Sequence, residues 1–281
     1  MQCWMNGNYM AAQDLRISPF DHGFLYGLGF FETFRTYGGQ VFDWEAHMTR
    51  LQEALSQYRI HLPYTEQALL DVVQQLNQQA DGQDGYFRLN VSAGEHAIGL
   101  QPIAYQQPNV IIFRKELQNP PRGTEKTAQW LTTPRNTPEQ ALRFKSHHYG
   151  NNVLGRFEVP SLAQHEGFFV TQEGYIAEGV TSNIFWVKND ILYTPSLKTG
   201  ILPGIIRAWV IQKAKMLGLE VREGFFPKQD IRQSTECFIT NSIQELVPIS
   251  SLEQQQFLGN KGLVYSCLHE AFVKEVECLH A

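Results

Sequence analysis

Hydrophobic residues recur at two different periods in the first part of the chain. Between Gly29 and Tyr37 an apolar run leads into Gly38-Gly39, a pattern typical of a strand that ends in a hairpin turn. Apolar spacings of three and four residues predict two helices, one over 44–58 and one over 65–79. Shorter strands are expected over 4–5, 86–93 and 109–114. Residues 1–117 are therefore predicted to form an N-terminal α+β domain.

Strands and helices alternate in the second part of the chain. Strands are expected over 168–171, 184–187, 191–193 and 236–240, and helices over 151–164, 205–217 and 261–277. The stretch between the two parts, Gln118–Thr124, contains Pro-Pro and Gly, which break both helix and sheet. The sequence therefore predicts a linker over 118–124 and a C-terminal α/β domain over 125–281.

Composition limits the class of protein. The net charge of −5 gives no basic footprint for nucleic acid or for an anionic membrane. No apolar run approaches the roughly 20 residues that span a bilayer, and the first residues do not resemble a signal peptide. The cysteines are scattered, without a C-x-x-C pair, at positions 3, 237, 267 and 278. We therefore expect a cytoplasmic enzyme without a disulfide framework, a zinc site, a nucleic-acid partner or a membrane partner.

Three stretches suit pyridoxal 5'-phosphate (PLP) when they are taken in order. Lys145 lies in Arg143-Phe-Lys-Ser-His-His-Tyr149, Glu178 stands just before a strand, and Gly204-Ile205-Ile206 opens a long apolar helix after a Gly/Pro turn. PLP needs a Schiff-base lysine, an acid for its pyridine nitrogen and a cradle for its phosphate. The order of amine, carboxylate and helix N-terminus therefore predicts PLP as the cofactor.

Each of these residues also has an ordinary structural interpretation. A single lysine is usually a surface residue, but aromatic and histidine neighbours favour a partly buried amine that can act as a nucleophile or base. Glu178 could be a solubilising residue at a strand edge, and most helix N-termini bind nothing. The joint order of the three features favours the functional interpretation.

Two further groups of basic residues have similar alternatives. His47 and Arg50 share one helix face and alone would form a solvated pair; beside a phosphate site, Arg50 becomes a natural partner for the dianion. The adjacent His147 and His148 lack a third ligand at metal-binding spacing, so no metal site is predicted.

The motifs together resemble those of the fold type IV PLP enzymes, a group that includes branched-chain aminotransferases, D-amino acid aminotransferases and 4-amino-4-deoxychorismate lyases. The resemblance runs nearly end to end, over 21–35, 47–51, 145, 178–185, 201–207 and 240–248. It implies a two-domain α+β fold of the D-amino acid aminotransferase-like type, with the cofactor at the domain interface. It also implies a homodimer.

The same resemblance implies roles for individual residues. Lys145 would be the catalytic lysine and Glu178 would contact the pyridine nitrogen. The residues implied in cofactor binding are Arg50, Lys145, Glu178, Asn183, Gly204, Ile205, Ile206, Asn241 and Ser242. The family motif usually reads Gly-Ile-Thr-Arg, so Ile206 removes one hydroxyl contact to phosphate, for which Thr240 and Ser242 are candidate replacements.

Finer marks favour one member of the group. D-amino acid aminotransferases carry an arginine that grips carboxylate where this chain has Ala93, and Ser146–Tyr149 does not match the Gly-Gly-Asn-Tyr run of branched-chain enzymes. The stretches 18–27, 136–139 and 143–149 resemble aminodeoxychorismate lyases of Bacillus-like bacteria. We therefore expect a lyase of folate biosynthesis that converts 4-amino-4-deoxychorismate to 4-aminobenzoate and pyruvate. A D-amino acid or branched-chain aminotransferase is the alternative, and a non-catalytic PLP-binding protein is the third hypothesis.

The expected substrate carries two carboxylates, which need cationic partners. Arg88 and the His147-His148 pair are the candidates for this role. The residues expected to contact substrate are Phe31, Arg88, His148 and Tyr149.

Overall fold

The structure is a computed structural model that describes residues 2–100, 102–118 and 121–280. It contains two compact units: unit 1 comprises Met1–Gln118, Phe144–His148 and Val276–Ala281, and unit 2 comprises Asn119–Arg143 and Tyr149–Glu275. The expected division kept 125–281 together, whereas here the five residues around Lys145 group with unit 1, because they pair with a strand of that unit. Residues 119 and 120 of the expected linker lie outside the described residues.

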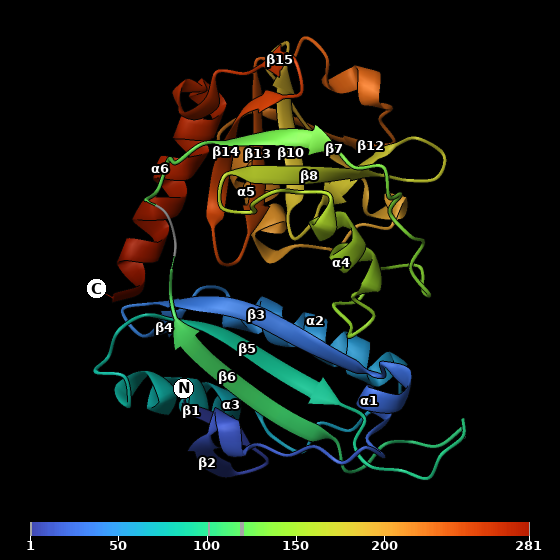
Figure 1. Cartoon of the computed structure of the whole chain (residues 1–281). Coiled ribbons are helices and arrows are strands. Elements are labelled where there is room, and N and C mark those ends of the chain that lie inside the picture. Colours follow the sequence, from blue (N-terminus) through green and yellow to red (C-terminus); the bar gives the residue numbers. More distant parts are fainter. Residues whose placement is uncertain (1, 101, 119–120, 281) are drawn as a thin grey trace. The chain divides into compact units, whose positions relative to one another are not determined.

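Unit 1 is built on a six-stranded antiparallel sheet with the order β2-β1-β6-β5-β3-β4 (Figure 1). Its strands are β1 (Gln2–Met5), β2 (Asn8–Ala11), β3 (Gly29–Tyr37), β4 (Gln40–Val41), β5 (Gly85–Ser92) and β6 (Asn109–Glu116). Its helices are η1 (Ala12–Asp14), α1 (His22–Tyr26), α2 (Trp44–Gln57) and α3 (Glu66–Gln78). The two long helices and the three long strands confirm the elements predicted from hydrophobic periodicity.

Strand β3 has two different faces because successive side chains of a strand alternate. Phe30 and Phe34 enter the core of unit 1, together with Met48 and Leu51 of α2 and with residues of α3. Phe31 is also buried, but its ring contacts polar and charged side chains instead of this core. The sheet of unit 1 therefore has one face that packs against helices and a second face on which Phe31 contacts cationic side chains.

Unit 2 is built on a nine-stranded mixed sheet with the order β12-β11-β10-β13-β14-β7-β8-β9, and β15 pairs with β14. The pairs β11–β12, β14–β7 and β7–β8 are parallel. The strands are β7 (Lys126–Trp130), β8 (His165–Val170), β9 (Ile176–Gly179), β10 (Asn183–Lys188), β11 (Ile191–Pro195), β12 (Glu220–Gly224), β13 (Glu236–Asn241), β14 (Glu245–Leu252) and β15 (Gln255–Gln256).

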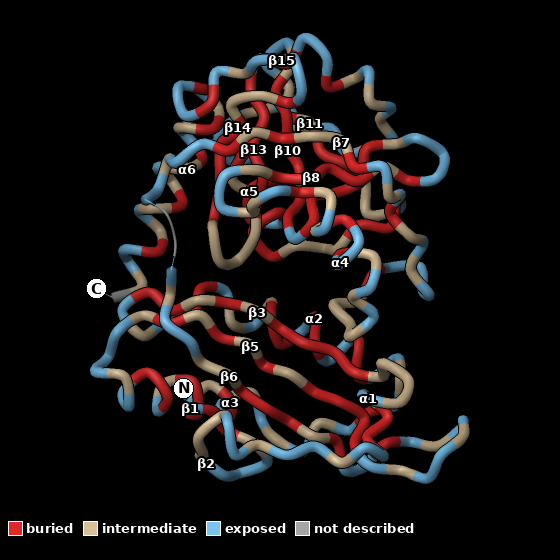
Figure 2. The backbone as a smooth tube through the Cα atoms, viewed as in Figure 1, coloured by how far each residue is buried: buried red, intermediate tan, exposed pale blue. Residues whose placement is uncertain are grey.

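The α-helices after the linker are α4 (Gly150–Phe157), α5 (Ile205–Met216) and α6 (Leu263–Glu277), with short 3-10 helices η2 (Leu197–Thr199), η3 (Lys228–Ile231), η4 (Gly259–Lys261) and η5 (Cys278–His280). Buried residues concentrate along the central strands of unit 2, which appear red in Figure 2. Phe168, Ile184, Trp186 and Ile239 belong to the core around these strands. The expected strands at 184–187, 191–193 and 236–240 are confirmed.

The helix expected over 151–164 is too long, since α4 ends at Phe157. Pro160 explains the early end, because a proline disfavours helical backbone in the residue before it. The Arg156 side chain donates to the carbonyl oxygen of Val159 just beyond the last turn. The apolar residues at 159 and 162 instead pack in a small cluster around Phe169.

Candidate active site

The segment that carries Lys145 pairs with the first half of β3. Phe31 N–H donates to the Lys145 carbonyl at 2.8 Å, and His147 N–H donates to the Gly29 carbonyl at 2.9 Å. Phe30 and Ser146 form the antiparallel bridge between these two bonds. Because side chains alternate along paired strands, Lys145 and His147 lie on the same face as Phe31. A side chain at Gly29 would collide with the His147 ring, so this position needs glycine.

Two cations meet at the ring of Phe31. The Lys145 Nζ lies 4.8 Å from the ring centroid, and the Arg88 Cζ lies 3.5 Å from it. Both distances are within the range of cation–π attraction. A pair of positive charges on one buried aromatic ring creates a local positive potential, which favours an anionic ligand.

Asn90 connects Arg88 to His147. Its Oδ1 accepts hydrogen bonds from Arg88 Nε and Nη2 at 3.3 and 3.2 Å, and it lies 2.9 Å from His147 Nε2. The His147 ring also stacks on Phe31. Arg88, Asn90, His147 and Lys145 thus surround a single aromatic ring in unit 1.

His147 does not supply the positive charge that the sequence suggested for it. Burial, followed by the charge of Arg88, lowers the pKa of His147 to about 4, so the ring is neutral at physiological pH. His148 is exposed, and its ring lies against Gly27, with Nε2 3.3 Å from the Tyr26 carbonyl. His147 therefore offers a substrate carboxylate no positive charge at neutral pH, while Arg88 carries a permanent charge.

Arg50 is held in a buried ion-pair group at the other face of the unit 1 sheet. Its Nε and Nη2 donate to the two carboxylate oxygens of Glu32 at 2.8 and 2.6 Å, and His47 Nδ1 lies 2.7 Å from Glu32 Oε2. Burial alone would raise the pKa of Glu32, but Arg50 and His47 outweigh it and hold this pKa at about 2. His47 and Arg50 thus both contact a buried carboxylate and do not form a solvated pair.

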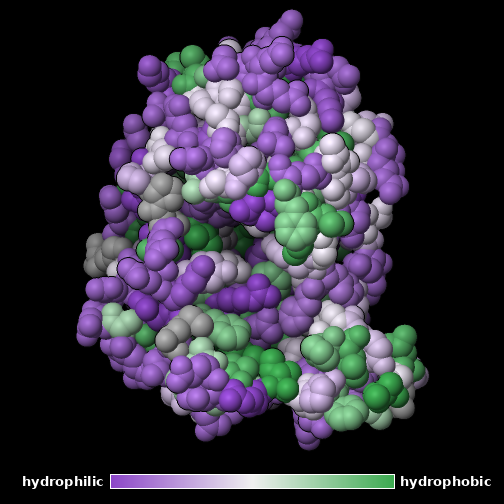
Figure 3. Space-filling view, viewed as in Figure 1, coloured by the Kyte–Doolittle hydropathy of each residue, from purple (hydrophilic) through white to green (hydrophobic). Residues whose placement is uncertain are grey.

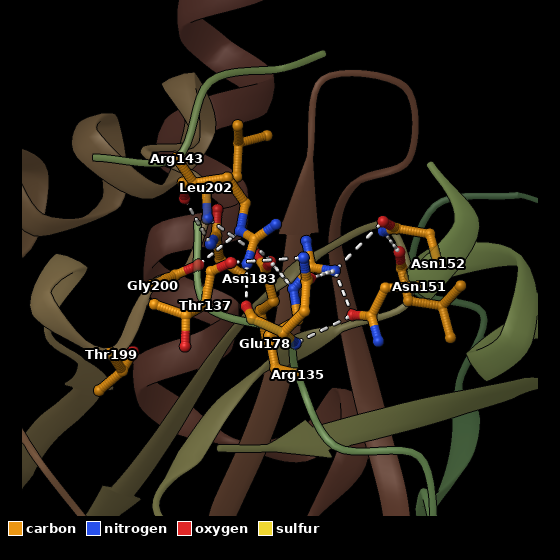
Figure 4. Close-up of polar contacts among 12 residues, drawn as sticks. Arg135, Thr137, Arg143, Asn151, Asn152, Glu178, Asn183, Thr199, Gly200 and Leu202 are labelled. Carbon is orange, nitrogen blue, oxygen red and sulfur yellow. Dashed lines mark hydrogen bonds and ion pairs between the residues drawn. The ribbon is translucent and has the colours of Figure 1, made fainter. Parts of the chain in front are cut away.

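Glu178 lies at the centre of a second polar cluster, which is in unit 2 (Figure 4). Its Oε1 accepts from Arg135 Nε at 2.7 Å, with Arg143 Nε at 3.9 Å, and its Oε2 accepts from Leu202 N–H at 2.9 Å. The carboxylate is almost completely buried. Each oxygen of Glu178 is therefore fixed by a separate donor, which defines the orientation of the carboxylate.

Amides and carbonyl groups hold the two arginines in place. Arg135 Nη1 donates to the side-chain oxygens of Asn151 and Asn152 at 2.6 and 3.2 Å. Arg143 donates to the main-chain carbonyls of Gly200 and Asn136. Burial, and then the nearby charge of Arg135, lowers the pKa of Arg143 to about 10, which still leaves it cationic at neutral pH.

The first turn of α5 lies beside Asn183. A side chain at Gly204, the residue before the helix, would collide with Asn183 Oδ1, and Asn183 Nδ2 donates to the Leu202 carbonyl at 3.0 Å. Among the described residues, no side chain caps this helix end. The backbone N–H groups of a first turn have no partner within the helix and favour an anion. Ile205 and Ile206 supply such groups here.

The turn between β13 and β14 contains Asn241 and Ser242. Asn241 Oδ1 accepts from the backbone N–H groups of Ile243 and Gln244 at 3.0 and 2.7 Å, which fixes the turn. Lys126 is almost fully buried, and its Nζ donates to Gln244 Oε1 at 3.0 Å. The predicted polar loop is therefore an ordered turn that is braced by a buried lysine.

Each unit brings only some of the predicted residues together. Unit 1 brings Lys145, Phe31 and Arg88 together, with Arg50 in the ion-pair group and His148 at the Tyr26 carbonyl. Unit 2 brings Asn183, Gly204 and the start of α5 together, with Glu178 joined to the same loop through Leu202. Tyr149 is the residue before α4 in unit 2.

Sequence reasoning missed Glu32, Asn90, Arg135 and Arg143 as site residues. Glu32 had a detectable signal, because it shares the inward face of β3 with Phe30 and Phe34, and a carboxylate there needs a buried cation. Arg135 had none, since it lies in an irregular loop 43 residues from the carboxylate that it contacts.

The chain matches a known protein family over most of its length. The family model described as amino-transferase class IV matches residues 29–252, which include Lys145, Glu178 and the start of α5. The chain belongs to the class IV aminotransferase family. The fold type IV architecture implied by the sequence is thereby confirmed. This family is PLP-dependent.

Two proteins of known name are similar to the chain over nearly its whole length. The aminodeoxychorismate lyase of Bacillus subtilis (strain 168) is 38% identical over 276 residues, which cover 98% of this chain and 94% of the relative. The solved branched-chain amino acid aminotransferase of Escherichia coli is 27% identical with a TM-score of 0.88, covering 97% of this chain and 93% of that one.

The third relative shares the fold. The branched-chain aminotransferase of the thermophilic archaeon Thermoproteus uzoniensis, solved with norvaline, is 24% identical with a TM-score of 0.88, covering 98% of this chain and 94% of that one. Within the described residues of the present chain, no helix has both the length and the apolar character needed to cross a bilayer.

Proposed function

We propose that this class IV aminotransferase family member is a PLP-dependent aminodeoxychorismate lyase that forms 4-aminobenzoate and pyruvate, a step of folate biosynthesis. The observation that carries the proposal is the arrangement at Phe31, where the Lys145 amine and the Arg88 guanidinium share one ring. An amine that can move protons is thus placed next to a permanent cation that can bind a substrate carboxylate. The 38% identity to the Bacillus subtilis lyase supports the lyase over other family activities.

The residues of both units suit PLP. Lys145 would attach the cofactor, and Glu178, whose oxygens are fixed by Arg135 and Leu202, would contact the ring nitrogen. The phosphate would be held by the backbone N–H groups of Ile205 and Ile206 next to Asn183 and Gly204, and by Asn241 and Ser242, whereas Arg50 already pairs with Glu32 in unit 1. Gly204 supports this assignment, because the absence of a side chain there leaves the Asn183 amide against the helix start.

The residues around Phe31 would carry out the proton transfer. When bound, PLP would supply an electron sink for the ring carbon that bears the substrate amine. Lys145 Nζ would take the proton from this carbon, and the electron pair left behind would form the third double bond of the aromatic ring as the bond from the ring to the enolpyruvyl oxygen breaks. The departing enolpyruvate would take up a proton to give pyruvate. Arg88 would hold a carboxylate of the substrate during this step. The neutral His147, fixed by Asn90, would leave Arg88 and Lys145 as the cations at the ring.

A branched-chain or D-amino acid aminotransferase is the second candidate, because the chain shares its fold, with 27% identity, with the Escherichia coli branched-chain enzyme. The purified protein, supplied with PLP, would be given aminodeoxychorismate in one assay. In two others it would receive leucine or D-alanine with 2-oxoglutarate. We expect 4-aminobenzoate and pyruvate in equal amounts from the first assay and little glutamate from the others.

The Lys145→Met variant, purified in the same way, controls for contaminating enzymes in all three assays. Glutamate formation as fast as 4-aminobenzoate formation would contradict the lyase and favour the aminotransferase. Inactivity in all three would contradict both.

The proposal includes a homodimer, and unit 1 offers an apolar surface for it. Phe24 and Leu100 are 74% and 82% exposed, and Ile17, Phe20 and Ile98 lie exposed in the same two loops. His96 N–H donates to the Phe20 carbonyl, which joins the loops into one patch. Figure 3 shows green, hydrophobic surface over α1 and the loop that follows β5. Contiguous apolar patches of this kind mark protein interfaces more often than scattered apolar residues do.

Substitution Leu100→Asp is expected to convert the dimer to a monomer, because a carboxylate cannot be buried in an apolar contact without a partner. Light scattering after size-exclusion chromatography measures the mass. Leu263→Asp is the matched control, since Leu263 is also 82% exposed but lies in unit 2. A wild-type monomer, or a dimer that persists in Leu100→Asp, would contradict this interface.

A further inference from the structure

Thr240 has a buried hydroxyl group that makes no hydrogen bond within the described part of unit 2. The residue is 1% exposed on β13, and its Oγ1 has no hydrogen-bond partner among the described residues. A buried hydroxyl without a partner is unfavourable, because its hydrogen bonds to water are lost without replacement. Such a group in a native protein calls for an explanation, and a bound ligand is one of them.

The neighbours of Thr240 indicate where such a ligand would lie. Thr240 is directly opposite Asn183 in the antiparallel pair of β13 and β10, so the two side chains emerge on the same face about 4.5–5.5 Å apart at Cβ. The Asn183 amide in turn lies against Gly204, the residue that precedes α5. Helix α5 also packs against β13. The unpaired hydroxyl therefore lies beside the start of α5.

The chemistry at this point suits an oxyanion. The backbone N–H groups of Ile205 and Ile206 are donors that no side chain caps among the described residues. Thr240 Oγ1 adds a hydroxyl donor that can rotate toward an oxygen atom. The Ile206 side chain adds none, although it occupies the first turn where a hydroxyl would meet the same anion. The donor missing from the helix is thus present on the neighbouring strand.

We propose that Thr240 Oγ1 donates a hydrogen bond to the phosphate group of PLP, in place of the hydroxyl that Ile206 lacks. This inference rests on the proposed function, because it requires that the chain binds PLP. It adds a phosphate-binding residue on β13 to the donors at the start of α5.

The variant Thr240→Val tests the proposal, because valine has nearly the same shape and no hydroxyl. The Kd of the cofactor-free protein would be measured by fluorescence titration for PLP and for pyridoxal, which lacks the phosphate. We expect the Kd for PLP to rise about 10- to 100-fold, as for the loss of a hydrogen bond to a charged group. The Kd for pyridoxal should stay within about twofold of its wild-type value.

Two further variants control for effects on the fold. Thr240→Ser keeps the hydroxyl and should bind PLP nearly as tightly as the wild type. Ser234→Ala removes another buried hydroxyl of unit 2 that has no partner among the described residues, and it should change neither Kd. The melting temperature of cofactor-free Thr240→Val should not fall below that of the wild type, because an unpaired hydroxyl has been removed.

Three results would overturn the proposal. Wild-type affinity for PLP in Thr240→Val would show that the hydroxyl makes no contact, and an equal loss for PLP and pyridoxal would show a general effect on the site. In either case the proposed function would stand. A wild-type protein that binds neither ligand would instead remove the proposed function, and with it this role of Thr240.

Discussion

Replacing Lys145 with methionine is expected to lower turnover of aminodeoxychorismate by roughly 10²–10⁴-fold, the usual contribution of a positioned proton-transfer group. Methionine fills similar space, so the pairing of 145–147 with β3 should persist. Covalent attachment of PLP should be lost as well. In the wild type, borohydride reduction followed by peptide mapping should locate the cofactor on the peptide that contains Lys145.

Lys115 provides a matched control for this substitution. Its Nζ lies 4.3 Å from the centroid of the Tyr86 ring, an arrangement like that of Lys145 and Phe31, but the residue is exposed on β6. Lys115→Met should keep full activity. Lys126 is the strongest rival site, because it is buried and burial lowers its pKa, which makes a lysine more nucleophilic. Cofactor found on Lys126, or activity retained in Lys145→Met, would disprove the assignment.

Substitution Glu32→Gln is expected to lower the free energy of unfolding by about 3 kcal/mol near neutral pH. The amide keeps the size of the side chain but removes the charge that Arg50 and His47 contact in the core of unit 1. Removing one partner of a buried ion pair leaves the other charge uncompensated, which typically costs about 3–5 kcal/mol. Urea denaturation monitored by circular dichroism measures the change.

The pH dependence of this effect follows from the pKa of Glu32. Its folded-state pKa is lowered from 4.5 to about 2, which corresponds to ~3 kcal/mol of stability. A lowered carboxylate pKa stabilises the fold fully above the ordinary pKa, and this contribution is lost as the pH falls through 4.5 toward 2. The stability difference between wild type and Glu32→Gln should therefore shrink over this range.

The exposed Glu53 on the same helix as Arg50 gives a control with the same chemical change. Glu53→Gln should alter the free energy of unfolding by no more than about 0.5 kcal/mol at any pH in this range. If Glu32→Gln changed the free energy of unfolding as little as Glu53→Gln does, the ion-pair group of Glu32, Arg50 and His47 would not stabilise the fold as described.

The sequence predicted the elements whose signals are local. Helices α2 and α3 and strand β3 follow from the spacing of apolar residues over a few turns or a few alternations. The order of Lys145, Glu178 and Gly204 could be interpreted because PLP needs three different chemical groups. These predictions required no knowledge of which distant residues meet.

The parts that could not be predicted depend on distant contacts. Arg135 gained its role only through the fold, which brings its loop to Glu178. The neutral state of His147 could not be predicted, because it depends on burial and on Arg88, and neither can be derived from adjacent residues. The parallel pairing of β7 with β14 and β8 likewise joins segments that are separated in sequence.

The pairing of the Lys145 segment with β3 has a consequence for how the enzyme matures. The two partners are far apart in the sequence, so this short ladder raises the contact order and forms only after a long loop has closed. During synthesis on the ribosome, β3 leaves the exit tunnel long before the lysine does. A nascent chain that stops before residue 144 would contain the buried core residues of unit 1 between Trp4 and Ile112, but it would lack Lys145. The reactive amine would reach its surroundings late in folding, when the aromatic ring that receives it is already in place.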